Sequence, residues 1–164
     1  MLLHLCIDYV RRKGLKRRIG VFHMDYEIQY RETIDYVDRM LSENADILDV
    51  YRICVPFKVQ TCTSMFQQFW RPWEESKREN WVRRMPDGCF RREDFPFFNE
   101  TMWDYEFQNC FEEWLHQRKK AGRTCFLIGI RTQESLNRWR CIYSDRNHLS
   151  LIHISEPTRP ISIS

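Results

Sequence analysis

Apolar residues recur along this chain in two alternating patterns, one typical of helices and one typical of strands. Amphipathic spacing predicts helices over residues 2–12, 30–41, 101–120 and 132–142. Short β-branched and aromatic runs predict strands over residues 19–24, 47–55 and 124–130. Helices that alternate with strands indicate an α/β fold, in which helices cover both faces of a parallel sheet.

An aromatic-rich insert at about residues 57–100 interrupts this alternation. It mixes aromatic residues with arginine and proline, and the aromatic residues include Trp70, Trp73, Trp81, Phe95, Phe97 and Phe98. One interpretation is a core and lid element. The alternative is a surface for a partner or a nucleic acid, because basic side chains interleave with aromatic ones as they do in stacking sites. These basic residues are Arg71, Lys77, Arg78, Arg83, Arg84, Arg91 and Arg92.

The segment LSLIHISEPTR and the residues after it, 149–164, form a separate pattern. In one frame this segment is similar to the translation of a transposon end and adaptor used in sequencing libraries. We expect the natural sequence to end near His148, and the tail to be an artefact that takes no part in the fold. An ordinary polar tail is the alternative. Residues 1–148 are then expected to form one partial α/β domain.

Composition narrows the class of protein. The chain is 43% hydrophobic, which is enough for a core, and its net charge of +3 is too small to indicate nucleic-acid binding by itself. No run approaches the roughly 18 apolar residues that a membrane span needs. A basic run follows the apolar start instead of preceding it, which argues against export. Seven scattered cysteines without a C-x-x-C pair favour reduced thiols in a cytoplasmic protein, with no protein-bound metal.

Two predicted strands end in polar residues. His23, Asp25 and Glu27 lie at or just after the end of the first strand; Gly129, Arg131, Glu134, Ser135 and Arg138 lie at or just after the end of the third. Ligands of open parallel sheets bind beyond the carboxyl ends of the strands. Arg131 precedes a predicted helix, and an arginine beside a helix N-terminus can hold a phosphate or sulfate. The alternatives are a surface ion pair between Arg131 and Glu134, and a helix-capping role for Asp25 and Glu27.

The same residues belong to a longer series of motifs. In order, they are VFHMDYEIQYRET, the F-x-x-x-W-x-x-W spacing from Phe66 to Trp73, WVRRMP, FPFF and LIGIRTQES. This series resembles the phosphoadenosine phosphosulfate (PAPS) reductase-like proteins of the DUF3440 subgroup, within the PP-loop or adenine-nucleotide α-hydrolase superfamily. The resemblance covers residues 1–148 and implies a Rossmann-like parallel sheet with flanking helices.

The chain departs from this family in what it lacks. The family's pyrophosphate-binding loop, SGGKDS, and the strand before it are absent, and LLHLCIDYVRRKG resembles the helix that this loop feeds. The ECG-type motif that carries the reductases' cysteine is also not found. We therefore expect an incomplete fold truncated at both ends, and no sulfonucleotide reduction by this chain.

The resemblance also implies roles for matched residues. His23, Met24 and Asp25 would lie beside an adenine, partly through backbone groups, with Glu27 nearby. Arg131 and Arg138 would face the phosphate or sulfate end; Glu134 would orient Arg131 or a metal-bound water, next to Ser135 and Gly129. The implied ligand is ATP or a PAPS-like nucleotide with Mg²⁺, and the implied reaction is cleavage or transfer at the α-phosphate, with no catalytic residue assigned. The alternative is a non-catalytic module, linked to nucleotides or nucleic acid, that acts with a ParB-like partner.

Overall fold

The computed structural model describes residues 2–61, 65–120 and 122–129. Within them the main helices are α1 (Leu2–Lys13), α2 (Arg31–Glu43) and α3 (Asp104–Arg118), and the longer strands are β1 (Ile19–Met24) and β2 (Leu48–Ile53). The short elements are β3 (Val59–Gln60), β4 (Phe69–Trp70) and the 3₁₀ helices η1 (Glu75–Asn80) and η2 (Arg92–Asp94). Leu5–Gly122 is one compact unit, and the few described residues outside it belong to a second unit.

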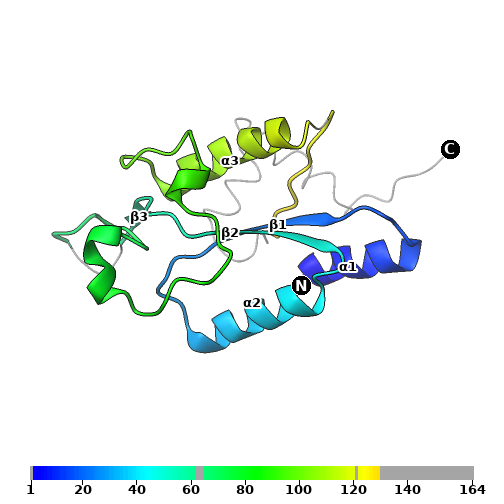
Figure 1. Cartoon of the computed structure of the whole chain (residues 1–164), viewed down its shortest axis with the longest axis horizontal. Coiled ribbons are helices and arrows are strands. Elements are labelled where there is room, and N and C mark those ends of the chain that lie inside the picture. The colour runs from blue at the N-terminus through cyan, green and yellow to red at the C-terminus, as the bar shows by residue number, and fades with distance from the viewer. Residues whose placement is uncertain (1, 62–64, 121, 130–164) are drawn as a thin grey trace. The chain divides into compact units, whose positions relative to one another are not determined.

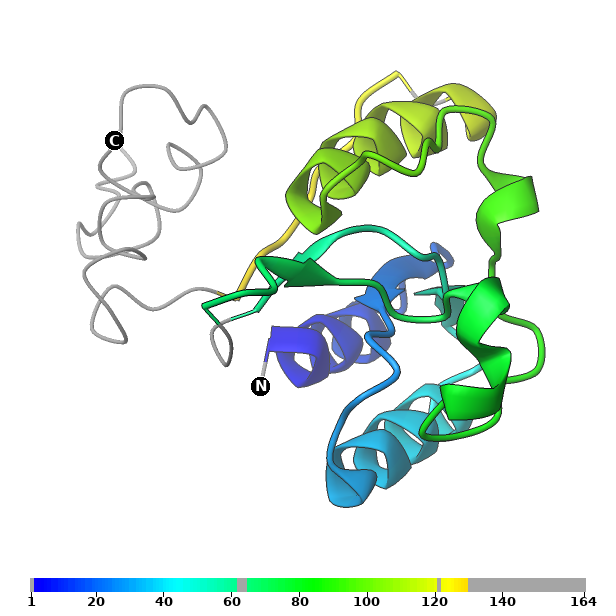
Figure 2. The ribbon, with the colours of Figure 1, turned by 90° about the vertical axis from the view of Figure 1, so that its left-hand side faces the viewer.

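The centre of the larger unit is a two-stranded parallel sheet. β1 pairs with β2 in register from Ile19 opposite Leu48 to Met24 opposite Ile53. α3 lies over one face of this sheet, and α2 lies over the other (Figures 1 and 2). The predicted mixed α/β arrangement, with a small parallel sheet between helices, is therefore confirmed for the described residues.

An aromatic stack joins α3 to the sheet. The rings of Phe22 on β1 and Phe111 on α3 are stacked with their centroids 4.3 Å apart. Tyr51 on β2 meets the same Phe111 ring edge-on at 5.7 Å. Phe107, one helical turn before Phe111, is fully buried and packs at 5.7 Å against Phe57, which follows β2. Phe107 and Phe111 thus lie on the core-facing side of α3.

The aromatic-rich insert contributes to the same core. Phe90 forms a one-residue bridge with Ile53, so that it pairs with the edge of β2 opposite to β1. Its backbone N–H donates to the carbonyl of Arg52 at 2.8 Å, and its carbonyl accepts from Cys54 N–H at 2.9 Å. Phe95 is buried and meets Phe107 edge-on at 5.0 Å. The insert is therefore built into the sheet and core through Phe90 and Phe95.

The third predicted helix begins later than its sequence indicates. It starts at Asp104, and the carboxylate of Glu106 accepts the backbone N–H of Trp103 at 2.8 Å. The hydroxyl of Thr101, the first residue of the predicted helix, instead donates to the Asn99 side chain at 2.5 Å. Asn99 thus competes for the threonine, which stays in the preceding turn, and Trp103 forms a one-residue bridge with Lys58.

The third predicted strand is wrong for the residues that the structure describes. Residues 124–129 belong to no strand ladder. The apolar run had indicated a strand buried on both faces, yet Cys125 is exposed and Leu127 is 56% exposed. Hydrophobicity alone does not create a strand, since the strand also needs a neighbour for its backbone groups. Residues 130–148, with the helix predicted over 132–142, and the tail 149–164 lie outside the described residues.

Candidate functional site

The carboxyl ends of β1 and β2 lie at the same edge of the sheet, because the two strands are parallel. β1 ends at Met24 and continues into Asp25, whose N–H still donates to the carbonyl of Ile53 at 2.9 Å. β2 ends at Ile53 and continues into the buried Cys54. This edge is the place where ligands of parallel sheets bind, and it contains the first group of residues predicted from the sequence.

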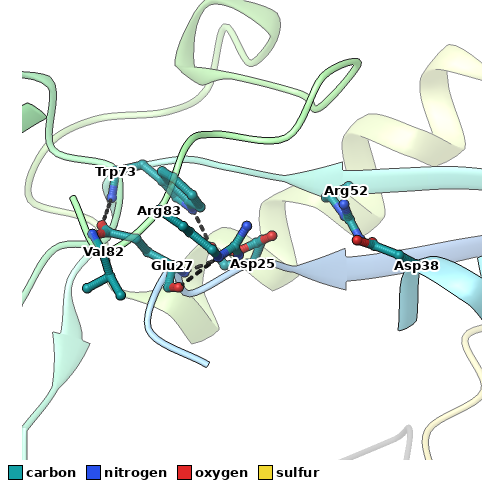
Figure 3. Close-up of polar contacts among 7 residues, drawn as sticks. All are labelled: Asp25, Glu27, Asp38, Arg52, Trp73, Val82 and Arg83. Atoms are coloured by element: carbon teal, nitrogen blue, oxygen red, sulfur yellow. Dashed lines mark hydrogen bonds and ion pairs between the residues drawn. The ribbon is translucent and has the colours of Figure 1, made fainter. Parts of the chain in front are cut away.

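Asp25 is buried and ion-paired. Its side chain is 2% exposed, and its Oδ1 pairs with a terminal guanidinium nitrogen of Arg83, whose side chain is 19% exposed. The same oxygen accepts the backbone N–H of Glu27 at 3.0 Å, which closes a tight turn directly after β1. Asp25 therefore holds Arg83 of the insert against the end of the strand (Figure 3).

Glu27 is the second buried carboxylate of this turn. Its two oxygens accept backbone N–H groups from separate parts of the insert, Trp73 at 2.9 Å and Val82 at 2.9 Å. Its backbone carbonyl also accepts Nε of Arg83 at 3.0 Å. Buried N–H groups need acceptors, and one carboxylate here satisfies two of them. Glu27 does not cap α2, since the residue before that helix is Tyr30 and it makes no side-chain capping bond.

Trp73 completes the connection between the insert and β1. Its indole Nε1–H donates to the backbone carbonyl of Asp25 at 2.7 Å. The guanidinium carbon of Arg83 lies 4.9 Å from the Trp73 ring centroid, within range for a cation–π contact. Asp25, Glu27, Trp73 and Arg83 therefore form one buried network, which we call the insert clamp (Figure 3).

His23 lies beside the insert clamp, on β1. Burial lowers the pKa of its imidazole, the negative charge of Asp25 opposes this, and the positive charge of Arg52 adds to the lowering. Arg52 on β2 is itself ion-paired with Asp38 of α2 (Figure 3). The imidazole is therefore biased towards its neutral form, which can donate from one nitrogen and accept at the other.

The backbone of β1 offers a second kind of site, along the edge that faces away from β2. Ile19 and Asp25 both donate their N–H groups to β2 carbonyls, at 2.8 and 2.9 Å. In a parallel ladder the backbone groups of successive residues point alternately to the two sides. The N–H and C=O groups of Phe22 and Met24 therefore point away from β2, and no other described strand pairs with them. The last outward pair of β1 belongs to Met24.

A cleft of about 620 Å³ lies beyond the end of β2. Its walls include Cys54 and Pro56, which directly follow that strand, and Trp73 of the insert clamp. The insert supplies most of the remaining lining, including Arg71, Arg78, Trp81 and Arg91. The cleft has the volume of a small-molecule site, and its lining combines Trp81 with four arginines and four glutamates.

The structure brings together the site residues predicted at the end of the first strand, whereas most of those predicted after the third strand are not among the described residues. His23, Met24, Asp25 and Glu27 gather at the end of β1, whereas Arg131, Glu134, Ser135 and Arg138 lie outside the described residues. Gly129 is described; a Cβ added there would lie 3.5 Å from the Leu2 side chain, which is ordinary contact and shows no close backbone approach.

Sequence reasoning missed that Trp73 and Arg83 are the partners of the two carboxylates. The alternation of basic and aromatic residues in the insert was the available signal, and it was interpreted as a lid or a surface. Among the described residues, no group of three or more His, Cys, Asp or Glu side chains could hold a metal ion. No helix in the described part of the chain is long and apolar enough to cross a membrane.

Comparison with known proteins gives one relative to report. The chain is 32% identical over 146 residues to the uncharacterized protein YbdN of Escherichia coli (strain K12). The aligned region is 88% of this chain but 34% of YbdN, so the chain spans about a third of that relative's length. No family model matches the chain. No solved structure matches it either.

Proposed function

We propose that this chain is part of an adenine-nucleotide-binding protein similar to the PAPS reductase-like proteins. The whole protein would bind ATP or a PAPS-like nucleotide and cleave or transfer at the α-phosphate. The order of sequence motifs from β1 to residue 135 supports this proposal, as does a parallel α/β core in which the VFHMDYE motif ends at the carboxyl edge.

The outward backbone pair of Met24 is the observation that carries the proposal. An extended residue presents one N–H donor and one C=O acceptor side by side. Adenine presents the complementary pair, an acceptor at N1 and a donor at N6, on its Watson–Crick edge. The outward groups of Met24 lie at the end of β1, next to the buried Asp25, so an adenine would be read there by backbone groups.

The Rossmann-like arrangement is part of the same proposal. In a doubly wound sheet the first strand lies between the second and the fourth. If β1 and β2 correspond to the second and third strands, the family's first strand would run along the open edge of β1. It would pair with Gly20 and Phe22, and residues 124–130 would pair with it in turn. This arrangement explains why an apolar run such as residues 124–129 has no ladder in the described structure.

The two carboxylates take a positioning role in this proposal. Asp25 is engaged by Arg83, and Glu27 by the N–H groups of Trp73 and Val82. Both oxygens of Glu27 and Oδ1 of Asp25 are therefore already engaged within the chain. The insert clamp would fix the backbone that follows Met24, and with it the edge that reads the base.

Magnesium does not fit the residues at this edge. Mg²⁺ needs oxygen ligands with octahedral geometry, and both carboxylates here already satisfy an arginine or backbone N–H groups. The described residues contain no other cluster of potential metal ligands. We therefore assign no magnesium ligand to this part of the chain, and no step of the reaction is derived through the ion.

The test compares ATP with GTP on a form of the protein extended at its N-terminus with an SGGKDS-type loop. Guanine reverses the pattern, with an acceptor at O6 and a donor at N1, so the Met24 backbone pair would reject it. We expect ATP to bind at least about tenfold more tightly than GTP by titration calorimetry, since an unpaired buried polar group costs about 1–3 kcal/mol. Equal affinities would refute base recognition by this edge.

Arg131 is tested in the same extended protein. Arg131→Ala is expected to cost roughly 1.5–3 kcal/mol of nucleotide binding, about a tenfold to hundredfold loss in affinity. Arg131→Lys should retain only part of the affinity, because a lysine cannot bind a phosphate through two parallel N–H groups as a guanidinium does. Arg17→Ala is the matched control, because that side chain is exposed and does not line the cleft. The unextended chain is expected to bind ATP weakly, since the family's loop supplies the N–H groups that cradle phosphates.

The reaction itself separates the enzyme from the alternative. Release of pyrophosphate from ATP by the extended protein, with AMP or an adenylylated acceptor as the other product, would support catalysis. Nucleotide binding without turnover, together with retention of a ParB-like protein, would favour the non-catalytic module.

A further inference from the structure

The lining of the cleft beyond β2 holds four arginines and four glutamates, and two of these arginines, Arg71 and Arg91, are in no ion pair within the described part of the chain. The one described polar contact of Arg71 is a hydrogen bond to the backbone carbonyl of Glu100 at 3.0 Å. Of the acidic residues in the lining, Glu75 and Glu100 pair with Arg78 and Arg92 of the same lining, and Glu74 pairs with Lys77 outside it. Glu93 is in no ion pair within the described part of the chain.

Arg71 also has an unused donor. Its Nε is buried and has no hydrogen-bond partner among the described residues. The guanidinium carbon lies 5.1 Å from the centroid of the Phe69 ring, which limits its movement. A buried donor without an acceptor costs free energy. Because Nε itself is buried, an anionic oxygen in the cleft would contact Arg71 through its terminal nitrogens.

The aromatic wall of the cleft is already arranged for stacking on planar groups. The guanidinium carbon of Arg78 lies 5.5 Å from the ring centroid of Trp81. The Trp81 ring is fixed by a hydrogen bond from its Nε1 to the carbonyl of Glu74 at 3.2 Å, and by an edge-on contact with Trp73 at 5.3 Å. Nucleic-acid bases stack on tryptophan rings and on arginine planes in this way.

A second hollow of about 420 Å³ continues from the cleft. The two share Arg78, Trp81, Met85 and Arg91 in their linings. Four of the seven residues lining the second hollow are arginines, against one aspartate. The exposed pairs Arg78–Glu75 and Arg84–Asp87 are worth little in water, and their arginines can exchange a carboxylate for a phosphate.

We propose that the cleft and the second hollow form a binding groove for single-stranded nucleic acid. Two connected hollows with a shared aromatic and basic wall suit a chain of repeating units, each with a flat base and one negative charge. A base would stack at Trp81, and neighbouring phosphates would contact Arg91 and Arg71. This function goes beyond nucleotide binding at β1 and does not rest on it.

Single strands fit this groove better than duplexes or acidic polypeptides. Bases in a duplex are stacked on one another and present no free face to Trp81. An acidic peptide would satisfy the arginines but would leave the indole face without a planar partner. The Trp81 ring, which lines both hollows, therefore favours the polynucleotide.

The experiment measures fluorescence anisotropy of a labelled 12-nucleotide oligo(dT), and of the matching oligo(U), titrated with the 164-residue chain at several NaCl concentrations. We expect binding that weakens with salt, with a log–log slope of roughly −0.7 for each phosphate contacted. Arg91→Ala should weaken binding about tenfold and reduce the slope by roughly one contact. Trp81→Ala should also weaken it about tenfold, and Trp81→Phe should restore most of the loss.

Arg17→Ala is the matched control, because Arg17 is exposed, carries the same charge and lies outside both hollows. Arg91 is exposed, so its substitution leaves the fold intact and keeps the test valid even if the Trp81 variants unfold. No binding at low salt would overturn the proposal. So would equal losses for Arg17→Ala and Arg91→Ala, tighter binding of duplex than of single strands, or equally tight binding of polyglutamate.

Discussion

Glu27 and Trp73 hold each other in left-handed backbone conformations. Glu27 has a φ of 65° and Trp73 a φ of 54°, and the Glu27 carboxylate accepts the Trp73 N–H at 2.9 Å. Residues other than glycine rarely adopt this conformation, because the Cβ approaches the following carbonyl. The hydrogen bonds of the insert clamp therefore offset backbone strain at both of its ends.

The variants Glu27→Ala and Glu27→Gly separate the hydrogen bonds of the Glu27 carboxylate from the strain of its backbone. Both variants leave the N–H groups of Trp73 and Val82 without their acceptor, so both should be less stable than the native chain. The loss should be about 1–3 kcal/mol for the buried N–H of Trp73 and smaller for Val82, which is exposed. Glycine removes the strain at a positive φ, so Glu27→Gly should be more stable than Glu27→Ala by about 1 kcal/mol. Urea unfolding of the three proteins measures both differences. Equal stability of native chain and Glu27→Ala would show that the carboxylate does not hold the insert.

Asp25 and Arg83 form an ion pair whose acidic partner is buried, so loss of either side chain leaves a charge without its partner. We expect Asp25→Ala to lower the free energy of unfolding by about 3–5 kcal/mol. Asp25→Ala combined with Arg83→Met should be more stable than Asp25→Ala alone, since no unpaired charge remains. A double-mutant cycle by urea unfolding gives the coupling. Additive losses in the double variant would mean that the pair contributes no coupling energy.

Local patterns predicted the elements, whereas the site depends on distant contacts. β1 spans Ile19–Met24, as its β-branched run indicates, and α2 spans Arg31–Glu43, close to the predicted 30–41. The partners of Glu27 lie 46 and 55 positions away along the chain. No periodicity encodes which backbone N–H a carboxylate will reach across such a distance, so D-x-E was recognised as a site but not as a clamp.

The apolar run at residues 124–130 shows a second limit of prediction from sequence. Its composition indicates a buried strand, but a strand exists only where another backbone supplies donors and acceptors. Residues 124–129 have no strand ladder, and Leu127 is 56% exposed. Sequence can give the propensity of such a segment, while the neighbour that completes it must be found elsewhere in the fold.

His23 should make stability depend on pH near neutrality. Burial lowers the pKa of its imidazole below the ordinary value of 6.5, so below that value the unfolded chain takes up a proton that the folded chain resists. The stability associated with neutral His23 is therefore complete above pH 6.5 and is lost as the pH falls towards the folded-state pKa. Native chain and His23→Gln should thus differ most in the free energy of unfolding above about pH 7.5, with the native chain losing more on acidification.

Urea unfolding at pH 7.5 and 5.5 tests this, because carboxylates titrate alike in both proteins and cancel in the comparison. If the native chain loses no more stability than His23→Gln between these two pH values, the lowered pKa of His23 does not contribute to the stability of the fold.

Cys54 and Cys125 should differ sharply in reactivity. Cys54 is buried, and both burial and the negative charge of Asp25 raise the pKa of its thiol. The thiolate is the nucleophile, so a thiol that is both inaccessible and protonated reacts slowly. Cys125 is exposed, so the reagent can reach its thiol. A short pulse of N-ethylmaleimide at pH 8, followed by digestion and mass spectrometry, should label Cys125 and leave Cys54 unmodified.

The same pulse in 8 M urea should label both thiols equally, which controls for intrinsic differences between the two peptides. Cys54 lines the cleft that we assign to single-stranded nucleic acid. Its rate of labelling therefore also measures how well the insert clamp shields the end of β2 from the reagent. Glu27→Ala releases the N–H groups of Trp73 and Val82 and should make Cys54 react faster in the folded chain, while Arg17→Ala should not. Labelling of Cys54 as fast as Cys125 in the native chain would mean that the clamp does not close the end of β2.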